Sequence, residues 1–265
     1  MLDDIVMSKY QEVEAAKARL PLEELQRRVE HHLAERNFGK ALQVPGKLSL
    51  IAELKRKSPS RGMLRERFDP VSLAQALEGA GAAALSVLTD EMYFGGSLDF
   101  LRDVKQFTEV PVLRKDFIVD PYQIYEASFY QADAVLLIVR VLTEEVLVQC
   151  LQVADALGLE PLVEVHNEQE LSVALAAGAH VIGINHRDLH TFTIDPTLSE
   201  RLVPRMPAGK IIVAESGIQT AEDIQRLQRL GVHAVLIGEA LMTAPDPVTK
   251  VRELFGTVWL PEGKR

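Results

Sequence analysis

The sequence predicts an α/β protein: one closed (β/α)8 barrel, the TIM barrel, with an N-terminal helical extension. Eight short apolar segments recur every ~26 residues, with helix-like stretches between them. The chain has 265 residues, close to the roughly 250 that are typical of one barrel. Eight units favour the barrel, and a doubly wound open sheet is the alternative. The predicted strands are 48–54, 83–88, 110–115, 133–139, 159–165, 179–185, 209–215 and 233–238.

The residues before the repeat have the spacing of extra helices. Ile5, Val6, Tyr10 and Val13 recur at helical intervals, and apolar residues between 22 and 33 continue the pattern. A third short helical turn is expected near residues 37–42. We expect these helices to cover the active face of the barrel rather than to plug its other end. The predicted single domain, 1–265, comprises N-terminal extra helices at 1–46, the barrel at 47–256 and a C-terminal tail at 257–265.

The strands of the repeat are apolar over most of their length, as in 134–139 and 210–214. Such runs are typical of parallel strands that are covered on both faces. Helices are predicted between the strands. Asp69 is the expected N-cap of a helix that begins at Pro70, and Gly231 is expected to end the helix of residues 220–230. Gly81 and Gly178 are expected to end helices in the same left-handed conformation.

Composition argues against several classes of function. The net charge of −9 disfavours a protein that binds nucleic acid or a membrane surface, because both need an extended basic face. The apolar fraction of 47% suits a large core, and no run approaches the roughly 18 apolar residues of a membrane helix. The chain does not start like an export signal, and its single cysteine, Cys150, cannot form an internal disulfide. We therefore expect a cytoplasmic protein.

Charged residues gather at the predicted ends of the strands. The C-terminal ends of all strands in a barrel share one face, so residues distant in sequence meet there. Glu53 and Lys55 end the first strand, and a basic loop that suits an anionic ligand follows them. One Lys–Glu pair can be purely structural, but several buried carboxylates and lysines are costly without a chemical task. The other strand ends include Lys115, Glu164, Asn185 and Glu215.

The last two strands end in a pattern that suits a phosphate. Ser216-Gly217 and Gly238-Glu239 follow them. Barrels that act on phosphorylated substrates commonly hold the phosphate there with backbone amides and a short helix N-terminus.

Two histidine pairs have simpler interpretations. His186 and His190 are four residues apart, a spacing found in metal sites, but neither an HExxH pattern nor a cysteine accompanies them. His31 and His32 lie in a charged helical stretch and are expected at the surface. We therefore expect no metal site.

Seven segments together resemble the indole-3-glycerol phosphate synthase family. The resemblance runs from about Phe38 to Leu254. That family closes an indole ring on 1-(2-carboxyphenylamino)-1-deoxyribulose 5-phosphate and releases carbon dioxide and water. The segments are 51–60 (IAELKRKSPS), Thr89 with 93–97 (YFGGS), 113–117 (LRKDF), 162–166 (LVEVH), 183–189 (GINHRDL), 214–218 (AESGI) and 236–242 (LIGEALM).

The resemblance implies roles for the charged strand ends. Lys115 is the general acid that protonates the ribulose carbonyl during ring closure. Lys55 or Lys115 is the acid of the later dehydration, and Glu164 is its base. Glu53 holds Lys115 in place by a salt bridge. Asn185 and Ser216 complete the implied catalytic set.

The resemblance also implies how the substrate is bound. Glu215 and Asn185 orient its hydroxyl groups, and Ser216 reaches its phosphate. At Glu239, where the family frequently has serine, the backbone amide rather than the carboxylate is expected to contact the phosphate. The implied substrate-binding residues are Ser58, Phe94, Phe117, Leu136, Arg187, Leu189, Glu215, Gly217, Ile237, Gly238 and Glu239.

Two alternatives stay open at this stage. A barrel like phosphoribosylanthranilate isomerase would use a Cys–Asp pair, but Cys150 is predicted on a helix rather than at a strand end. A non-catalytic phosphate-binding barrel would have lost some of the charged set. We expect no cofactor. The expected partner is the small phosphorylated, anthranilate-derived substrate, with tryptophan synthase or another pathway enzyme as a possible partner in trans.

Overall fold

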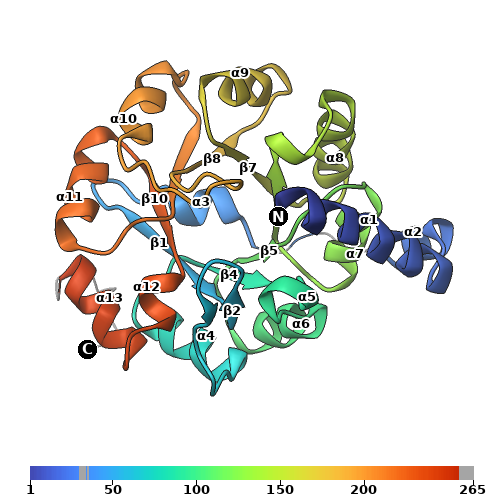
Figure 1. Cartoon of the computed structure of the whole chain (residues 1–265), viewed down its shortest axis with the longest axis horizontal. Helices are drawn as coiled ribbons and strands as arrows, with labels where there is room; N and C mark the ends of the chain where they lie inside the picture. Colours follow the sequence, from blue (N-terminus) through green and yellow to red (C-terminus); the bar gives the residue numbers. More distant parts are fainter. Residues whose placement is uncertain (30–33, 35, 257–265) are drawn as a thin grey trace.

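The computed structural model describes residues 1–29, 34 and 36–256, and its centre is a closed barrel of eight parallel strands (Figure 1). β1 closes the ring by pairing with β4 on one side and with β10 on the other. The predicted barrel is thus confirmed, and the open sheet is excluded. Each strand lies within its predicted segment. The barrel strands are β1 Ser49–Leu54, β4 Ala84–Leu88, β5 Val112–Lys115, β6 Ala134–Ile138, β7 Glu160–Val165, β8 Val181–Asn185, β9 Ile211–Glu215 and β10 Ala234–Ile237.

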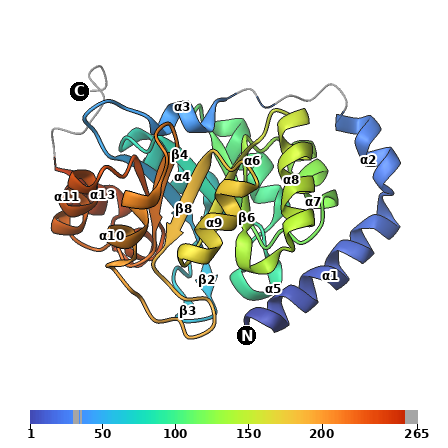
Figure 2. The ribbon, with the colours of Figure 1, turned by 90° about the horizontal axis from the view of Figure 1, so that it is seen from above.

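Helices surround the barrel as an outer layer (Figures 1 and 2). Asp69 caps α4 by accepting a hydrogen bond from Ser72 N at 3.2 Å, and Gly231 ends α11 at a φ of 91°, both as predicted. None of the described helices has the length and apolarity needed to cross a bilayer. The outer elements are α4 Pro70–Gly79, α5 Glu91–Phe94, α6 Leu98–Phe107, α7 Tyr122–Phe129, η1 Val139–Val141, α8 Glu144–Ala156, α9 Glu168–Ala176, α10 Leu198–Leu202, η2 Val203–Arg205, α11 Ala221–Leu230, α12 Glu239–Met242 and α13 Pro247–Phe255, with a hairpin of β2 Lys57–Ser58 and β3 Gly62–Met63 after β1.

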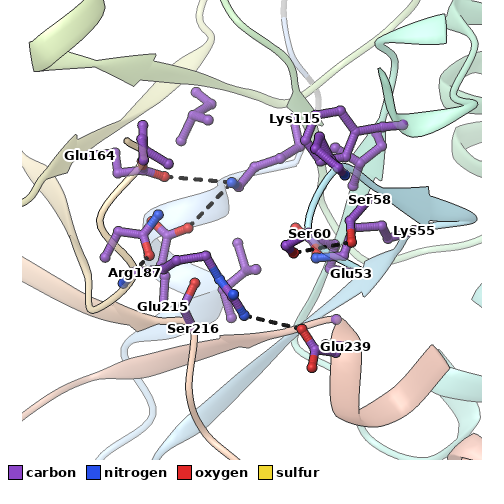
Figure 3. Close-up of a pocket in the computed structure, with 18 of the residues that line it drawn as sticks. Glu53, Lys55, Ser58, Ser60, Lys115, Glu164, Arg187, Glu215, Ser216 and Glu239 are labelled. Atoms are coloured by element: carbon purple, nitrogen blue, oxygen red, sulfur yellow. Dashed lines mark hydrogen bonds and ion pairs between the residues drawn. The ribbon is translucent and has the colours of Figure 1, made fainter. Parts of the chain in front are cut away.

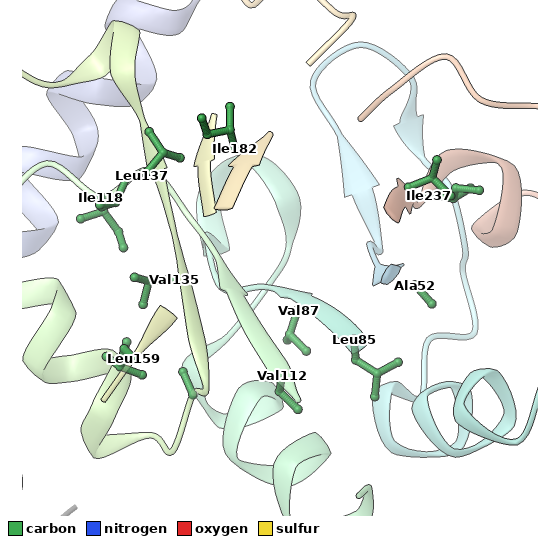
Figure 4. Close-up of a cluster of buried hydrophobic side chains, with 14 of the residues drawn as sticks. Ala52, Leu85, Val87, Val112, Ile118, Val135, Leu137, Leu159, Ile182 and Ile237 are labelled. Atoms are coloured by element: carbon green, nitrogen blue, oxygen red, sulfur yellow. The ribbon is translucent and has the colours of Figure 1, made fainter. Parts of the chain in front are cut away.

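Two apolar layers follow from the alternation of side chains along each strand. One layer lies between the strands and the outer helices, and Val87, Val135 and Ile182 belong to it (Figure 4). The other fills the barrel itself with residues such as Ile51 and Leu162. Because both faces of the sheet are covered, the strands read as nearly continuous apolar runs.

The N-terminal extension splits between the two ends of the barrel. It forms α1 Leu2–Arg19, α2 Leu22–Val29 and α3 Phe38–Leu42. α1 begins over the C-terminal ends of the strands, as predicted, whereas α3 lies at the opposite end (Figure 2). There Gly39 N donates to Glu160 Oε2 at 2.7 Å, and Glu160 begins β7. The expectation that the whole extension covers the active face is therefore wrong for α3, whose side chains plug the base of the barrel core.

A buried lysine fastens α1 to the barrel. Lys9 is 1% exposed, and its Nζ lies 3.0 Å from Asp90 Oδ2 and 2.9 Å from Asp116 Oδ1. Asp116 also accepts a hydrogen bond from Arg114 at 3.1 Å. We call Lys9, Asp90, Arg114 and Asp116 the latch cluster. Tyr10, in contrast, is 46% exposed, so its predicted place on the apolar face of this helix is wrong.

The remaining N-terminal and C-terminal predictions are only partly covered. α2 packs on α7, so the second extra helix is present. His31, His32 and the predicted tail at 257–265 lie outside the described residues.

Candidate active site

A pocket opens at the C-terminal ends of the barrel strands, and every residue of the predicted site lines it (Figure 3). The strands place these residues there because their ends share one face of the barrel. The predicted residues that the structure brings together are Glu53, Lys55, Ser58, Phe94, Lys115, Phe117, Leu136, Glu164, Asn185, Arg187, Leu189, Glu215, Ser216, Gly217, Ile237, Gly238 and Glu239.

Lys115 lies between two carboxylates at the centre of the pocket. Its Nζ is 3.5 Å from Glu164 Oε2 and 3.5 Å from Glu215 Oε2. We call these three residues the site cluster. The predicted salt bridge between Glu53 and Lys115 is wrong, because Glu53 pairs with Lys55. Residues 53 and 55 point to the same side of the chain, so these two side chains meet first.

The charges in the site cluster shift one another's proton affinity. Burial lowers the pKa of Lys115, but the negative charges of Glu215, Glu164 and Glu53 outweigh it and raise that pKa above its usual value. Burial also raises the pKa of Glu215, helped by repulsion from Glu164 and Glu53. Burial opposes ionisation of Glu164 too, but Lys115 and His166 lower its pKa. At neutral pH, the cluster thus holds a protonated lysine beside an ionised Glu164.

The carboxylates of the site cluster are buried but poorly satisfied. Glu164 and Glu215 are each 1% exposed, and none of their oxygens accepts a hydrogen bond of good geometry from the described residues. Such groups are costly unless they have a task. Two glycines make room for the pocket carboxylates. A Cβ on Gly183 would lie 2.2 Å from Glu215 Oε1, and one on Gly238 would lie 2.1 Å from Glu53 Oε1.

A left-handed turn follows β9. Ser216 has a φ of 66° and Gly217 a φ of 72°. A serine in this region is strained unless its surroundings hold it. His186 supplies the support, since its Nδ1 lies 3.1 Å from the Ser216 carbonyl oxygen and its Nε2 lies 2.7 Å from Ser199 Oγ. His186 therefore braces the turn. Among the described residues, no group of three or more His, Cys, Asp or Glu could hold a metal ion.

A carboxylate bridges two arginines at the mouth of the pocket. Glu239 Oε2 accepts a hydrogen bond from Arg187 at 3.1 Å (Figure 3). Glu239 Oε1 lies 3.0 Å from Arg61. The bridge joins the loops after β1, β8 and β10. It neutralises the carboxylate that otherwise would repel an anionic ligand from this end of the pocket.

An apolar slot lies beside the charged groups. The rings of Phe94 and Phe117 lie 6.0 Å apart, and Leu136 and Leu189 line the same pocket. Its apolar and aromatic lining suits an aromatic ring.

The pocket also contains residues that the sequence interpretation missed. Leu2 and Ile5 reach it from α1, and Ser60 and Phe192 reach it from loops. Leu2 and Ile5 recur with Lys9 at helical spacing, so the start of the helix carried a signal of a buried face. Ser60 lies in the loop that was predicted to suit an anionic ligand, although it was not named as a site residue, and Phe192 gave no comparable pattern. Cys150 is buried on α8 in the layer between helices and strands, so it cannot serve as a strand-end acid.

Comparisons with known proteins agree with this geometry. The family model described as indole-3-glycerol phosphate synthase matches residues 2–254. The indole-3-glycerol phosphate synthase of Dehalococcoides mccartyi (strain CBDB1) is 48% identical over 259 residues, which cover 96% of this chain and 100% of that relative. The protein of the same description from Roseiflexus castenholzii is 46% identical over 264 residues, covering 97% and 98%.

Solved structures with lower identity share the fold alone. The thiamine phosphate pyrophosphorylase of Pyrococcus furiosus has a TM-score of 0.60 at 20% identity and covers 82% of this chain and 98% of its own. A 3-hexulose-6-phosphate synthase has a TM-score of 0.64 at 15% identity, with coverage of 81% and 100%.

Proposed function

Because the chain belongs to the indole-3-glycerol phosphate synthase family, we propose that its pocket performs the ring closure of that family with Lys115 as the acid and Glu164 as the base. The substrate is 1-(2-carboxyphenylamino)-1-deoxyribulose 5-phosphate, and the reaction releases carbon dioxide and water. The observation that carries the assignment is the position of Lys115, whose Nζ lies 3.5 Å from both Glu164 and Glu215.

The first step joins the aromatic ring carbon to the ribulose carbonyl carbon. Lys115, protonated at neutral pH, gives its proton to the carbonyl oxygen as that oxygen gains charge. The substrate carboxyl group then leaves as carbon dioxide, and its bonding electrons restore the aromatic ring. The apolar slot of Phe94, Phe117 and Leu136 holds the ring against the carbonyl carbon.

The second step removes, as water, the hydroxyl group that formed from the carbonyl oxygen in the first step. Glu164 accepts a proton from the substrate, and the hydroxyl leaves with a proton from a lysine. Lys55 suits this role, since Lys115 has already given its proton in the first step. Its partner Glu53 keeps it in the pocket.

The substrate's anionic groups match the remaining residues. The left-handed turn at Ser216 and Gly217, with the start of α12 at Gly238 and Glu239, supplies backbone amides for the phosphate. Arg187 and Ser58 suit the carboxylate. Phosphate sites after the last two strands are common in barrels.

The assignment is tested with Glu164→Gln, which keeps the shape of the side chain but removes its basicity. We expect kcat to fall by ~10²-fold or more, the scale of lost general base catalysis, with a modest change in KM. Fluorescence of the indole product, formed from the synthetic ribulotide, measures both constants. A variant with wild-type kcat and much weaker binding would make Glu164 a binding residue instead.

The proposal extends to the cellular setting of the protein. A cytoplasmic location fits the single buried cysteine, Cys150. Association in trans with tryptophan synthase or another enzyme of the same pathway stays a prediction, which sedimentation of a mixture of the purified proteins would test.

A further inference from the structure

His166, at the end of β7, lies between two carboxylates. Its Nε2 is 3.2 Å from Glu164 Oε1, and its Nδ1 is 3.0 Å from Glu170 Oε2. The side chain is 2% exposed, so water does not compete for either nitrogen. A neutral imidazole has one N–H group and one acceptor nitrogen. Only the doubly protonated ring has an N–H group on the side of each carboxylate. Its contact with Glu170 is a hydrogen bond, whereas its contact with Glu164 is an ion pair without good hydrogen-bond geometry.

The second carboxylate is itself firmly held. Glu170 Oε1 accepts hydrogen bonds from Arg140 Nε at 2.9 Å and from Asn167 Nδ2 at 2.9 Å, and Glu170 Oε2 accepts one from the backbone N–H of His166 at 2.8 Å. These contacts fix the carboxylate against which the imidazole rests. The orientation of His166 toward Glu164 is therefore set by residues that lie outside the pocket.

Glu164 and Glu215 form a natural comparison within one pocket. Both are 1% exposed, and both lie 3.5 Å from Lys115. Only Glu164 also has an ion pair with His166. The pKa of Glu164 is lowered, whereas the pKa of Glu215 is raised. Burial and Lys115 are common to both carboxylates. The contact with His166, together with Asn185, favours the ionised form of Glu164, whereas repulsion from Glu164 and Glu53 raises the pKa of Glu215.

We propose that His166 is a positioning residue for the reaction, which acts as a buried imidazolium to hold Glu164 ionised and turned toward the substrate. This inference rests on the proposed function, in which Glu164 is the base. His166 touches neither the substrate nor the reacting atoms, since it does not line the pocket. It acts only through Glu164.

The charges around the ring support the protonated state. Burial lowers the pKa of His166, but Glu164 and Glu170 outweigh it and raise that pKa to about 9. The other charged groups nearby are Arg140, which pairs with Glu170, and Lys115 and Glu215, which lie beyond Glu164. An imidazolium whose pKa is raised keeps its charge below about pH 9 and loses it above that pH.

A first experiment observes the protonation state directly. Two-dimensional NMR of the ¹⁵N-labelled full chain reports both imidazole nitrogens of each histidine, and His166→Gln assigns the His166 signals. We expect both nitrogens of His166 to keep the imidazolium signature at neutral pH. In Glu170→Gln, which removes one of the two carboxylates, the titration midpoint should fall by about one pH unit or more. A neutral ring at pH 7 in the wild type would overturn the proposal.

A second experiment measures what the charge does for catalysis. We expect His166→Gln to lower kcat about 10-fold with KM within ~3-fold of wild type. Loss of the positive neighbour raises the pKa of Glu164, so the acid limb of the kcat profile should move to higher pH. Glu170→Gln should instead move the alkaline limb to lower pH. Glu168→Gln, a control on the same helix whose partner is the exposed Arg201, should change neither limb.

The outcomes separate this proposal from the one on which it depends. If Glu164→Gln stays active, the assignment of the base fails. If Glu164→Gln is inactive but His166→Gln keeps the wild-type pH profile, only the positioning role fails. If His166→Gln has a lower melting temperature but neither limb of its pH profile of kcat moves, His166 is purely structural. Should His166→Gln fail to fold, the alkaline limb of Glu170→Gln decides the question.

Discussion

Two groups of charges meet on neighbouring residues of one strand, yet they are built in opposite ways. In the latch cluster, Lys9 contacts Asp90 and Asp116 at 3.0 and 2.9 Å. In the site cluster, the contacts of Lys115 are both 3.5 Å, and the oxygens of its carboxylates lack well-formed hydrogen bonds from the described residues. Both groups are largely buried, so burial alone does not distinguish structure from chemistry.

The difference lies in how completely the charges are satisfied. A buried ion that is fully paired has no capacity left for a ligand, and breaking its pair is strongly destabilising. A buried ion with unfilled capacity can accept a substrate and transfer a proton. We therefore expect the latch cluster to fail through loss of stability and the site cluster to fail through loss of rate.

The largest effect is expected for Lys115→Ala. The variant should lose at least ~10²-fold in kcat, because it lacks the proposed acid of the first step, while its circular dichroism spectrum stays that of the wild type. Steady-state fluorescence of the indole product measures the loss. Lys210→Ala, at the opposite end of the barrel, is the control and should keep wild-type kcat. Retention of more than about a tenth of kcat, with chemistry limiting the rate, would remove Lys115 from this role.

Lys9→Met should show that the latch cluster acts on stability and the site cluster on rate. It leaves Asp90 and Asp116 buried without their shared cation, so we expect the free energy of unfolding to fall by about 3 kcal/mol. KM should rise, because Leu2 and Ile5 are no longer held over the pocket, while kcat changes little. Urea denaturation and steady-state kinetics check both effects.

The matched control lies on the same helix. Lys17 pairs with Asp120 at 2.7 Å but is 31% exposed, so Lys17→Met should cost less than about 1 kcal/mol. If Lys9→Met and Lys17→Met lose the same free energy of unfolding, the complete burial of Lys9 does not explain the stability that the latch cluster contributes.

Acid should weaken the latch cluster. Burial opposes ionisation of Asp116, but Lys9 and Arg114 outweigh it and lower the pKa to about 2. A lowered pKa stabilises the fold above the unfolded-state pKa of ~3.9, and that stability is lost as the pH falls from there to about 2. We expect the free energy of unfolding to fall by about 2 kcal/mol over this range because of Asp116. In urea denaturation, the difference in stability between the wild type and Asp116→Asn should therefore shrink as the pH falls. A gap that is constant with pH would assign the pairing no role in acid sensitivity.

The smallest effect is expected at the mouth of the pocket, for Glu239→Gln. Removing the carboxylate frees Arg187 for the substrate, so KM should fall by less than ~5-fold at low ionic strength. Added salt should reduce the difference in KM between the variant and the wild type, because the bridge is partly exposed. A higher KM in the variant would mean that the bridge organises the site instead of competing with the substrate.

Most of the site could be predicted because strand ends in a barrel converge wherever the strands begin. The apolar runs located Glu53, Lys115 and Glu164, and the topology then required them to share a face. The partners of each charge were harder to predict. Alternation along the chain favours the pairing of Glu53 with Lys55. The approach of Lys115 to Glu164 and Glu215 depends on side-chain reach across the barrel, which spacing along the chain does not contain.

Other features depend on packing that sequence patterns do not specify. An amphipathic pattern indicates that α3 is buried but not against which end of the barrel. Lys9 resembles a surface residue, with Glu12 three positions away. Its signal was its place among Leu2, Ile5 and Val13, where a buried face contains one cation. A lysine in an apolar stripe predicts a buried carboxylate elsewhere, though not which one.

The alternation of side chains along β5 means that an insertion or deletion in this strand would affect the pocket as well as the packing of the barrel. Arg114 on β5 and Asp116 directly after this strand belong to the latch cluster, and Lys115 between them reaches the pocket. Because side chains alternate with a period of two, inserting or deleting one residue in this strand would exchange the two sets. The amine that we propose as the acid would then lie among the outer helices, and a guanidinium would lie among the pocket carboxylates. Changes in loop length during evolution can therefore be accommodated before Val112 or beyond Phe117, but not between them.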